Sequence, residues 1–235
     1  MSRLILVHGD KGGVGKSTLS RAVLDYLYRK IRIPVVYDAD CRNSQVYRFY
    51  KDIFPVNQLD LRIRGAFDKI LDKLSEGKKT TEKYSVFVDL PAQAGKDLDE
   101  ALSEMRFVDA LDSIHARATV LFVIGRSMDS VNALQIASNI FGTSADFVVI
   151  KNGFFGEPDH YTLYDSSQIR QNLLKGGAKE LLIPVLWGDA YDAVDRLNLP
   201  FFKVAESELP LSTKARVSSW LDKFDAQFEK IDSWL

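Results

Sequence analysis

A glycine-rich segment directly follows a short apolar run near the start of the chain. Residues 9–18 read Gly-Asp-Lys-Gly-Gly-Val-Gly-Lys-Ser-Thr, and residues 4–7 before them are Leu-Ile-Leu-Val. Glycines let backbone N–H groups approach phosphate oxygens that a Cβ atom would obstruct, and a helix that starts there adds its positive dipole end. The segment therefore predicts a buried strand, a phosphate-binding loop and a helix, in that order.

Side chains within this loop have the chemistry of a Mg-nucleotide site. Lys16 would place a positive charge at the β- and γ-phosphates, and the Ser17 hydroxyl would be a ligand of Mg²⁺. The strict pattern G-x-x-x-x-G-K-[ST] fails at its first position, where Asp10 replaces glycine. A glycine-rich turn without a ligand is the alternative. The residues expected to contact the nucleotide are Lys11, Gly12, Gly13, Val14, Gly15, Lys16, Ser17 and Thr18.

Two later apolar runs end in carboxylates. Residues 35–40 read Val-Val-Tyr-Asp-Ala-Asp, and residues 84–91 read Tyr-Ser-Val-Phe-Val-Asp-Leu-Pro. Side chains two apart on a strand share a face, so Asp38 and Asp40 would both face Mg²⁺ and the attacking water if the strand extends through Asp40. Asp89 is expected at the carboxyl end of its strand, where open α/β sheets bind ligands. The alternatives are solvated acids at strand ends and, for Asp89, a helix cap.

The sequence Lys-Gly-Gly-Val-Gly-Lys-Ser-Thr at residues 11–18 resembles the deviant Walker A motif of the ParA/MinD family of P-loop ATPases. The resemblance implies that Lys11 reaches across a homodimer to the partner's nucleotide, and that Lys16 and Asp40 are catalytic, with Asp40 positioning the attacking water. It also implies that Asp38 and Asp89 support the water shell of Mg²⁺. A solvated Lys11 without such a contact is the alternative.

The choice of base depends on the run at residues 147–153, Phe-Val-Val-Ile-Lys-Asn-Gly. This run lacks the N-K-x-D sequence of guanine-specific sites. Asn152 stands where ParA-like chains carry an asparagine whose amide pairs with adenine, so the resemblance favours ATP over GTP. An Asn before a Gly is also an ordinary turn former.

Within the family, the chain is similar to the TraL/MobD-type ATPases of plasmid transfer and mobilisation. The likeness includes Asn-Ser-Gln at residues 43–45 and Asn-Gly-Phe-Phe-Gly at residues 152–156. The resemblance to the ParA/MinD family as a whole covers residues 3–155 well and the remainder poorly. These resemblances imply slow, partner-stimulated ATP hydrolysis, with an adaptor, relaxase or site-binding protein as partner and with non-specific DNA as a further ligand to consider. An ATP-dependent scaffold with little hydrolysis is the competing hypothesis. Small-molecule ligases and kinases of related fold would need a second substrate pocket.

Composition is consistent with one α/β domain over residues 1–235. Of the 235 residues, 46% are hydrophobic and 27% are charged, which is enough apolar surface for a sizeable core. The net charge of −1 excludes a global basic field that would recruit nucleic acid or acidic lipid. The single cysteine, Cys41, fits a reducing compartment. We expect a cytoplasmic protein without a signal peptide or a membrane-spanning segment.

Strand-like and helical patterns alternate, which predicts a three-layer P-loop NTPase fold: a mostly parallel sheet of about seven strands with helices on both faces. The expected strands are 3–8, 33–38, 84–89, 118–124, 146–151, 182–187 and, more weakly, 200–205. The expected helices are 16–30, 66–75, 97–114, 128–141, 167–174, 189–197 and 213–232.

Two segments allow more than one interpretation. Residues 41–65 mix arginines with aromatics, which suits nucleic-acid or partner binding but suits packing beside the first carboxylate segment better. Near the end of the chain an apolar stripe recurs at helical spacing. Its polar face is acidic rather than basic, so we expect packing against the sheet or a partner instead of stable membrane association. The stripe comprises Trp220, Leu221, Phe224, Phe228, Ile231 and Leu235.

Overall fold

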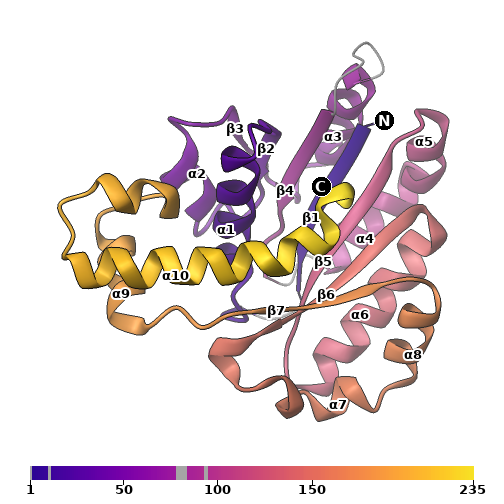
Figure 1. Cartoon of the computed structure of the whole chain (residues 1–235). Helices are drawn as coiled ribbons and strands as arrows, with labels where there is room; N and C mark the ends of the chain where they lie inside the picture. Colours follow the sequence, from indigo (N-terminus) through magenta and orange to yellow (C-terminus); the bar gives the residue numbers. More distant parts are fainter. Residues whose placement is uncertain (1, 10–11, 78–83, 93–94) are drawn as a thin grey trace.

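The computed structural model describes residues 2–9, 12–77, 84–92 and 95–235, and its centre is a seven-stranded sheet (Figure 1). The strands lie in the order β3-β2-β4-β1-β5-β6-β7, and each neighbouring pair is parallel. Their bounds are β1 Ser2–His8, β2 Val35–Asp38, β3 Val56–Gln58, β4 Tyr84–Asp89, β5 Arg117–Ile124, β6 Ala145–Asn152 and β7 Lys179–Ile183. The predicted parallel sheet of about seven strands is confirmed.

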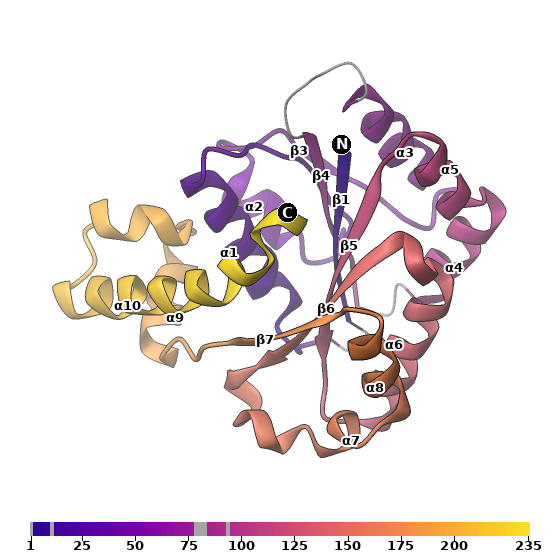
Figure 2. The ribbon, with the colours of Figure 1, turned by 45° about the vertical axis from the view of Figure 1, so that its right-hand side comes forward.

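Helices connect the strands and cover both faces of the sheet. Those on one face are α1 Lys16–Arg29, α2 Gln45–Tyr50, α9 Gly188–Arg196 and α10 Leu211–Phe228, with the 3₁₀ segments η5 Phe201–Glu206 and η6 Glu229–Trp234. Those on the other face are α3 Ala66–Glu76, α4 Gly95–Glu104, α5 Phe107–Ser113, α6 Met128–Phe141, α7 Thr162–Asp165 and α8 Gln168–Lys175. Figure 2 shows the two helical layers on either side of the twisted strands.

Central strands are apolar on both faces because each face is covered. In β1, residues 4–7 have no exposed surface, and β5 is buried along residues 118–123. Parallel sheets with two helical layers require such continuous apolar runs. Because all the strands run in parallel, the carboxyl ends of β1, β2, β4, β5 and β6 lie at one edge of the sheet. The loops at this edge carry the predicted site.

The structure corrects three strand predictions. Residues 56–58 form an edge strand, β3, that its sequence Val-Asn-Gln does not reveal. The last strand covers Lys179–Ile183 rather than 182–187, because Pro184 has no N–H for a strand hydrogen bond. Residues 200–205 were predicted as a weak strand, but Phe201–Glu206 is a 3₁₀ helix. Its buried residues Phe201 and Val204 are three apart, the spacing that aligns side chains in a 3₁₀ helix.

Two helical segments also differ from the sequence pattern. The predicted helix 97–114 is two helices, α4 and α5, which are separated at Arg106, a residue with φ of 47°. Residues 41–65 contain the short helix α2, and its aromatic residues Phe49 and Tyr50 are buried against the α1 face of the sheet. The packing interpretation of the aromatics in this segment is therefore confirmed.

The apolar stripe at the end of the chain is buried as expected. Trp220, Phe224 and Phe228 of α10 and Ile231 of η6 are each at most 3% exposed. In both views α10 lies across α1 (Figures 1 and 2). Within the described residues, no helix combines the length and the apolarity needed to span a membrane.

Candidate functional site

The glycine loop joins β1 to α1 with two left-handed backbone positions. Gly13 has φ of 79° and Gly15, the residue before α1, has φ of 100°. A Cβ atom on Gly15 would lie 2.2 Å from Nδ2 of Asn152, so only glycine fits there. Asp10 and Lys11 lie outside the described residues, and the role predicted for Lys11 stays a prediction. Gly13 has open space around it, so its left-handed backbone rather than a close neighbour favours glycine there.

Lys16 begins α1 and is 7% exposed. Its neighbour in space, His8, ends β1, and Nδ1 of His8 accepts the Gly9 N–H at 2.8 Å. Burial, and next the nearby Lys16 ammonium, lower the pKa of His8 to about 4, so the imidazole is neutral and can accept this bond. A buried ammonium at a helix N-terminus favours an anion in front of it.

Asp38 and Asp89 lie side by side at the carboxyl edge of the sheet. They are register partners in the parallel strands β2 and β4, and both are buried. Asp89 Oδ1 accepts the Ser20 hydroxyl of α1 at 2.7 Å. Burial raises the pKa of Asp89 to about 7, against the opposing effect of the Ser20 bond, and the charge of Asp38 raises it further. Burial likewise raises the pKa of Asp38 to about 6. A cation placed beside this pair would favour both ionised forms.

Asp40 does not share the strand of Asp38. Strand β2 ends at Asp38, and the N–H of Asp40 donates to Asp38 Oδ1 at 3.1 Å, so the chain turns there. The extension through Asp40 that would place both carboxylates on one strand face is therefore not present. Asp40 Oδ1 accepts the N–H groups of Arg42 and Asn43 at 3.3 and 3.2 Å. Asp38 Oδ2 accepts the Tyr47 N–H at 2.8 Å and so holds the start of α2.

Asn152 ends β6 and its side chain contacts the glycine loop. Nδ2 donates to the Val14 carbonyl at 3.0 Å, and Oδ1 accepts the Phe154 N–H at 3.1 Å. The Tyr161 hydroxyl bonds both the N–H and the carbonyl of Asn152, at 2.9 and 2.8 Å. The amide thus bridges the two loops that flank a cavity, and pairing with adenine stays a prediction.

A cavity of about 440 Å³ opens beside the glycine loop. Its walls are mostly apolar and come from the loop, from the end of β6, from residues 183–188 and from α9 and α10. Ligand pockets combine such apolar walls with a few polar groups that fix orientation. The lining residues are Gly13, Gly15, Thr18, Asn152, Phe154, Phe155, Ile183, Pro184, Leu186, Gly188, Tyr191, Asp192 and Trp220.

The oxygen donors of the site fit Mg²⁺. Ser17 stands half-buried in the first turn of α1, and Asp38 and Asp89 supply carboxylates nearby. Hydroxyl and carboxylate oxygens are the hard ligands that Mg²⁺ prefers. Across the described part of the chain, no group of three His, Cys, Asp or Glu side chains is placed to hold a metal. Phosphate oxygens and water would complete the coordination, as is usual for Mg²⁺ bound with nucleotides.

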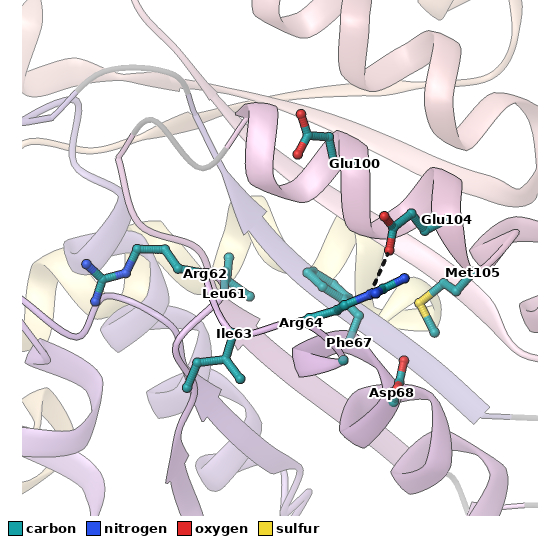
Figure 3. Close-up of a pocket in the computed structure, with 10 residues that line it drawn as sticks. Leu61, Arg62, Ile63, Arg64, Phe67, Asp68, Glu100, Glu104 and Met105 are labelled. Atoms are coloured by element: carbon teal, nitrogen blue, oxygen red, sulfur yellow. Dashed lines mark ion pairs between the residues drawn. The ribbon is translucent and has the colours of Figure 1, made fainter.

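A larger cavity, of about 620 Å³, lies on the opposite face of the sheet from α1 (Figure 3). Its walls come from residues 61–68 and from α4 and Met105. Arg64 and Glu104 form an ion pair at 3.6 Å across its mouth, and both side chains are largely exposed. None of its described lining residues belongs to the glycine loop, whereas Gly13, Gly15 and Thr18 line the smaller cavity, so the smaller cavity is the nucleotide-site candidate.

Sequence reasoning missed several residues of the site. Ser20 had a readable signal, because it follows Ser17 by three positions on α1 and so lies on a similar helix face. Tyr161 and Tyr191 had none, since each belongs to a segment far along the chain that only the fold brings to the loop. The Tyr191 hydroxyl lies 3.2 Å from Oγ1 of Thr18.

Comparison with known proteins agrees with this geometry. No protein-family model matches the chain. It is 25% identical over 223 residues to Protein MobD of Acidithiobacillus ferrooxidans, with 92% of each chain covered.

Among solved structures, the cell division protein MinD of Aquifex aeolicus aligns with a TM-score of 0.54 at 15% identity, covering 96% of this chain and 97% of MinD. A nucleotide-binding protein of Archaeoglobus fulgidus, solved in complex with ADP, aligns with a TM-score of 0.50 at 15% identity, covering 83% of this chain and 86% of that one. At such low identity these two structures show a common fold.

Proposed function

We propose that this chain, whose fold is that of the ParA/MinD-type P-loop ATPases, binds Mg-ATP, forms a nucleotide-sandwich homodimer and hydrolyses ATP slowly. The observation that carries the proposal is the position of buried Lys16. It starts α1 behind two left-handed glycines and lies at the same sheet edge as the Asp38–Asp89 pair. Such an arrangement brings together hydrogen-bond donors for phosphate and oxygen ligands for Mg²⁺ and its water shell.

Each residue of the site has one role in this proposal. The loop N–H groups and Lys16 bind the phosphates, and Ser17 is the direct ligand of Mg²⁺. Asp38 and Asp89 accept hydrogen bonds from the water shell of the metal. Mg²⁺ supplies positive charge that offsets the charge developing on the transferred phosphoryl group. Asp40 orients the attacking water after its turn opens, and Lys11 adds charge from the partner subunit.

The 440 Å³ cavity would hold the base and the ribose. Its apolar walls suit a purine, and Asn152 presents a carboxamide at the junction with the glycine loop. The ADP complex of the Archaeoglobus relative supports an adenine nucleotide in a chain of this fold. To recognise adenine, the Asn152 side chain would have to break its hydrogen bond to the Val14 carbonyl or to the Phe154 N–H, or share one of these bonds with the base.

The process served by the protein is inferred from relatives. Similarity to MobD over 92% of both chains supports a role in plasmid mobilisation, and the MinD-like fold supports the wider class of partition, positioning or transfer of DNA or another cargo. An adaptor, relaxase or site-binding protein would be the stimulating partner, in the cytoplasm.

Replacement of Asp40 tests the catalytic proposal. Asp40→Ala should abolish phosphate release, measured with DNA and partner protein present, while Mg-ATP binding by calorimetry stays within about twofold of the parent, because Asp40 contacts water rather than phosphate. Asp52→Ala, which removes an exposed acid just after α2, is the control. Equal release by Asp40→Ala and the parent would contradict the role of Asp40.

Replacement of Lys11 tests the dimer. Light scattering after size exclusion in Mg-ATP should show a dimer for the parent, an enriched dimer for Asp40→Ala and a monomer for Lys11→Ala. The physical reason is that the contact of Lys11 with the partner's phosphates is absent from a single subunit. A Lys11→Ala protein that dimerises like the parent would refute the contact.

One observation favours the scaffold alternative. The Asp40 carboxylate accepts two N–H groups of its own loop instead of facing open space. A protein that binds ATP and dimerises but keeps this turn closed would scarcely hydrolyse. A parent protein that forms the ATP-dependent dimer and releases no phosphate would establish the scaffold.

A further inference from the structure

A buried arginine and one aspartate connect three helices outside the phosphate loop. Arg21 of α1 has a side chain with no exposed surface, and its Nη1 lies 3.1 Å from Oδ1 of Asp195 in α9. The same oxygen lies 3.1 Å from Nη2 of Arg48 in α2. Asp195 therefore holds α1, α2 and α9 together through a single carboxylate oxygen.

On the α9 side, this connection begins at the nucleotide cavity. Gly188, Tyr191 and Asp192 of α9 line the cavity, one turn before Asp195. The Tyr191 hydroxyl lies 3.2 Å from Thr18 Oγ1, in the first turn of α1, and 3.4 Å from Arg21 Nη1. A ligand that contacts this wall of the cavity therefore contacts α9, the helix that carries Asp195.

On the α2 side, the connection ends at the carboxylates of β2. The Arg21 guanidinium lies 3.5 Å from the ring centre of Phe49, and Arg48 lies 4.6 Å from the same ring. The first turn of α2 donates the Tyr47 N–H to Asp38. With six residues, α2 is too short to be stable alone, so its position depends on these contacts.

We propose that Asp195 is a positioning residue that couples occupancy of the base cavity to the turn at residues 38–40, through Arg48 and α2. This inference rests on the proposed function, because the coupled ligand is Mg-ATP. Binding of the nucleotide holds α9 in place, the Asp195–Arg48 pair holds α2, and α2 holds Asp38 and the following turn in the open form in which Asp40 can orient water. Without the pair, the cavity can be filled while the turn remains closed.

Arg48 offers the cleaner variant, because its side chain is 45% exposed whereas Asp195 neutralises a buried arginine. The first measurement is hydrogen–deuterium exchange of residues 38–50 with and without Mg-ATP. In the parent, Mg-ATP should slow exchange across this segment. In Arg48→Ala the slowing should be lost, although calorimetry should give a Kd within about twofold of the parent, since Arg48 lies outside the cavity lining.

Turnover gives a second readout. Arg48→Ala should lower kcat about tenfold with little change in KM, a size typical of coupling between distant sites. Arg48→Lys, which keeps a cation, should restore part of the loss. Arg42→Ala, an exposed arginine of the same segment, is the matched control and should behave as the parent.

The outcomes separate this inference from the proposed function. A parent that does not bind Mg-ATP would overturn both. A parent that binds Mg-ATP, with the same ATP-dependent slowing of exchange at residues 38–50 in Arg48→Ala, would overturn the coupling and leave the proposed function standing. Equal loss of slowing in Arg42→Ala would also overturn it, because the effect would then not depend on Asp195.

Discussion

The two ends of helix α1 place charged side chains in opposite surroundings. At the N-terminal end, Lys16 is almost fully buried near Asp38 and Asp89, and burial raises the pKa values of both carboxyls. At the C-terminal end and just after it, charges form exposed or half-exposed pairs with α10 and η6. These pairs are Arg29 with Asp225, Lys30 with Glu229, and Arg32 with Asp232.

The two ends of α1 therefore differ in what their charges do: we expect those at the N-terminal end to act in ligand binding and those at the C-terminal end to act in stability. Charges exposed to water are already solvated, so each pair at the C-terminal end contributes little to the free energy of unfolding. Buried ionisable groups with shifted pKa values gather at ligand sites more often than elsewhere. The N-terminal end of α1 is therefore the end that we expect to bind a ligand, and its C-terminal end, with the chain just after it, is the docking end, which contacts α10 and η6.

The largest expected effect tests the docking end. Phe224 of α10 has no exposed surface and stacks on Phe228 with ring centres 4.3 Å apart. Phe224→Ala should lower the free energy of unfolding by about 3–5 kcal/mol in urea denaturation, because a large cavity is left. The Kd for Mg-ATP should not change. Lys223→Ala, on the exposed side of the same helix, is the control. If the Kd of Phe224→Ala differed more than about twofold from that of Lys223→Ala, nucleotide binding would depend on the docking of α10, contrary to this prediction.

Asp25, in the middle of α1, should give a pH-dependent effect. Burial raises its pKa to about 7, while its Oδ1 accepts the Tyr50 hydroxyl. The folded protein therefore binds this proton more tightly than the unfolded chain, and the stability it contributes at pH 4 is lost as the pH rises to 7. Asp25→Asn keeps the acceptor and removes the titration.

Urea denaturation from pH 4 to pH 8 measures this effect. The stability of Asp25→Asn relative to the parent should increase by up to roughly 4 kcal/mol between pH 4 and 7, and then level off. Asp52→Asn, an exposed acid, is the control for general charge effects. A constant difference between Asp25→Asn and the parent would show that Asp25 titrates normally.

Lys16 tests the binding end. Lys16→Ala should weaken Mg-ATP binding at least tenfold in calorimetry, because a charge-assisted bond of this kind contributes roughly 1.5–3 kcal/mol. Lys30→Ala, at the exposed end of the same helix, should leave the affinity unchanged. Equal affinity of Lys16→Ala and the parent would refute the phosphate site.

The smallest effect is expected for the exposed pairs. Arg29 makes two hydrogen bonds to Asp225, one from Nη1 and one of 2.7 Å from Nη2, with both side chains partly exposed. Asp225→Asn should lower the free energy of unfolding by about 0.2–1 kcal/mol at low salt, and less at high salt. A loss above about 2 kcal/mol, measured by urea denaturation, would show that ion pairs at this end also contribute strongly to the free energy of unfolding.

The sequence by itself determined the local parts of this protein. The glycine loop between β1 and α1 was readable because its strand, its left-handed turns and its helix start are consecutive in the chain. Asp89 was placed at a strand end because an apolar run precedes it and Pro91 soon follows. The central strands were readable because burial on both faces requires continuous apolar residues.

Tertiary structure alone decided which distant groups meet at the loop. The end of β2 at Asp38 depends on the Tyr47 N–H from α2, and the edge strand β3 has no apolar signal of its own. One wall of the 440 Å³ cavity comes from residues between 183 and 220, and Asp195 meets Arg21 and Arg48 across more than 140 positions of sequence. Such contacts are set by how helices pack on a twisted sheet, which periodicity along one segment does not encode.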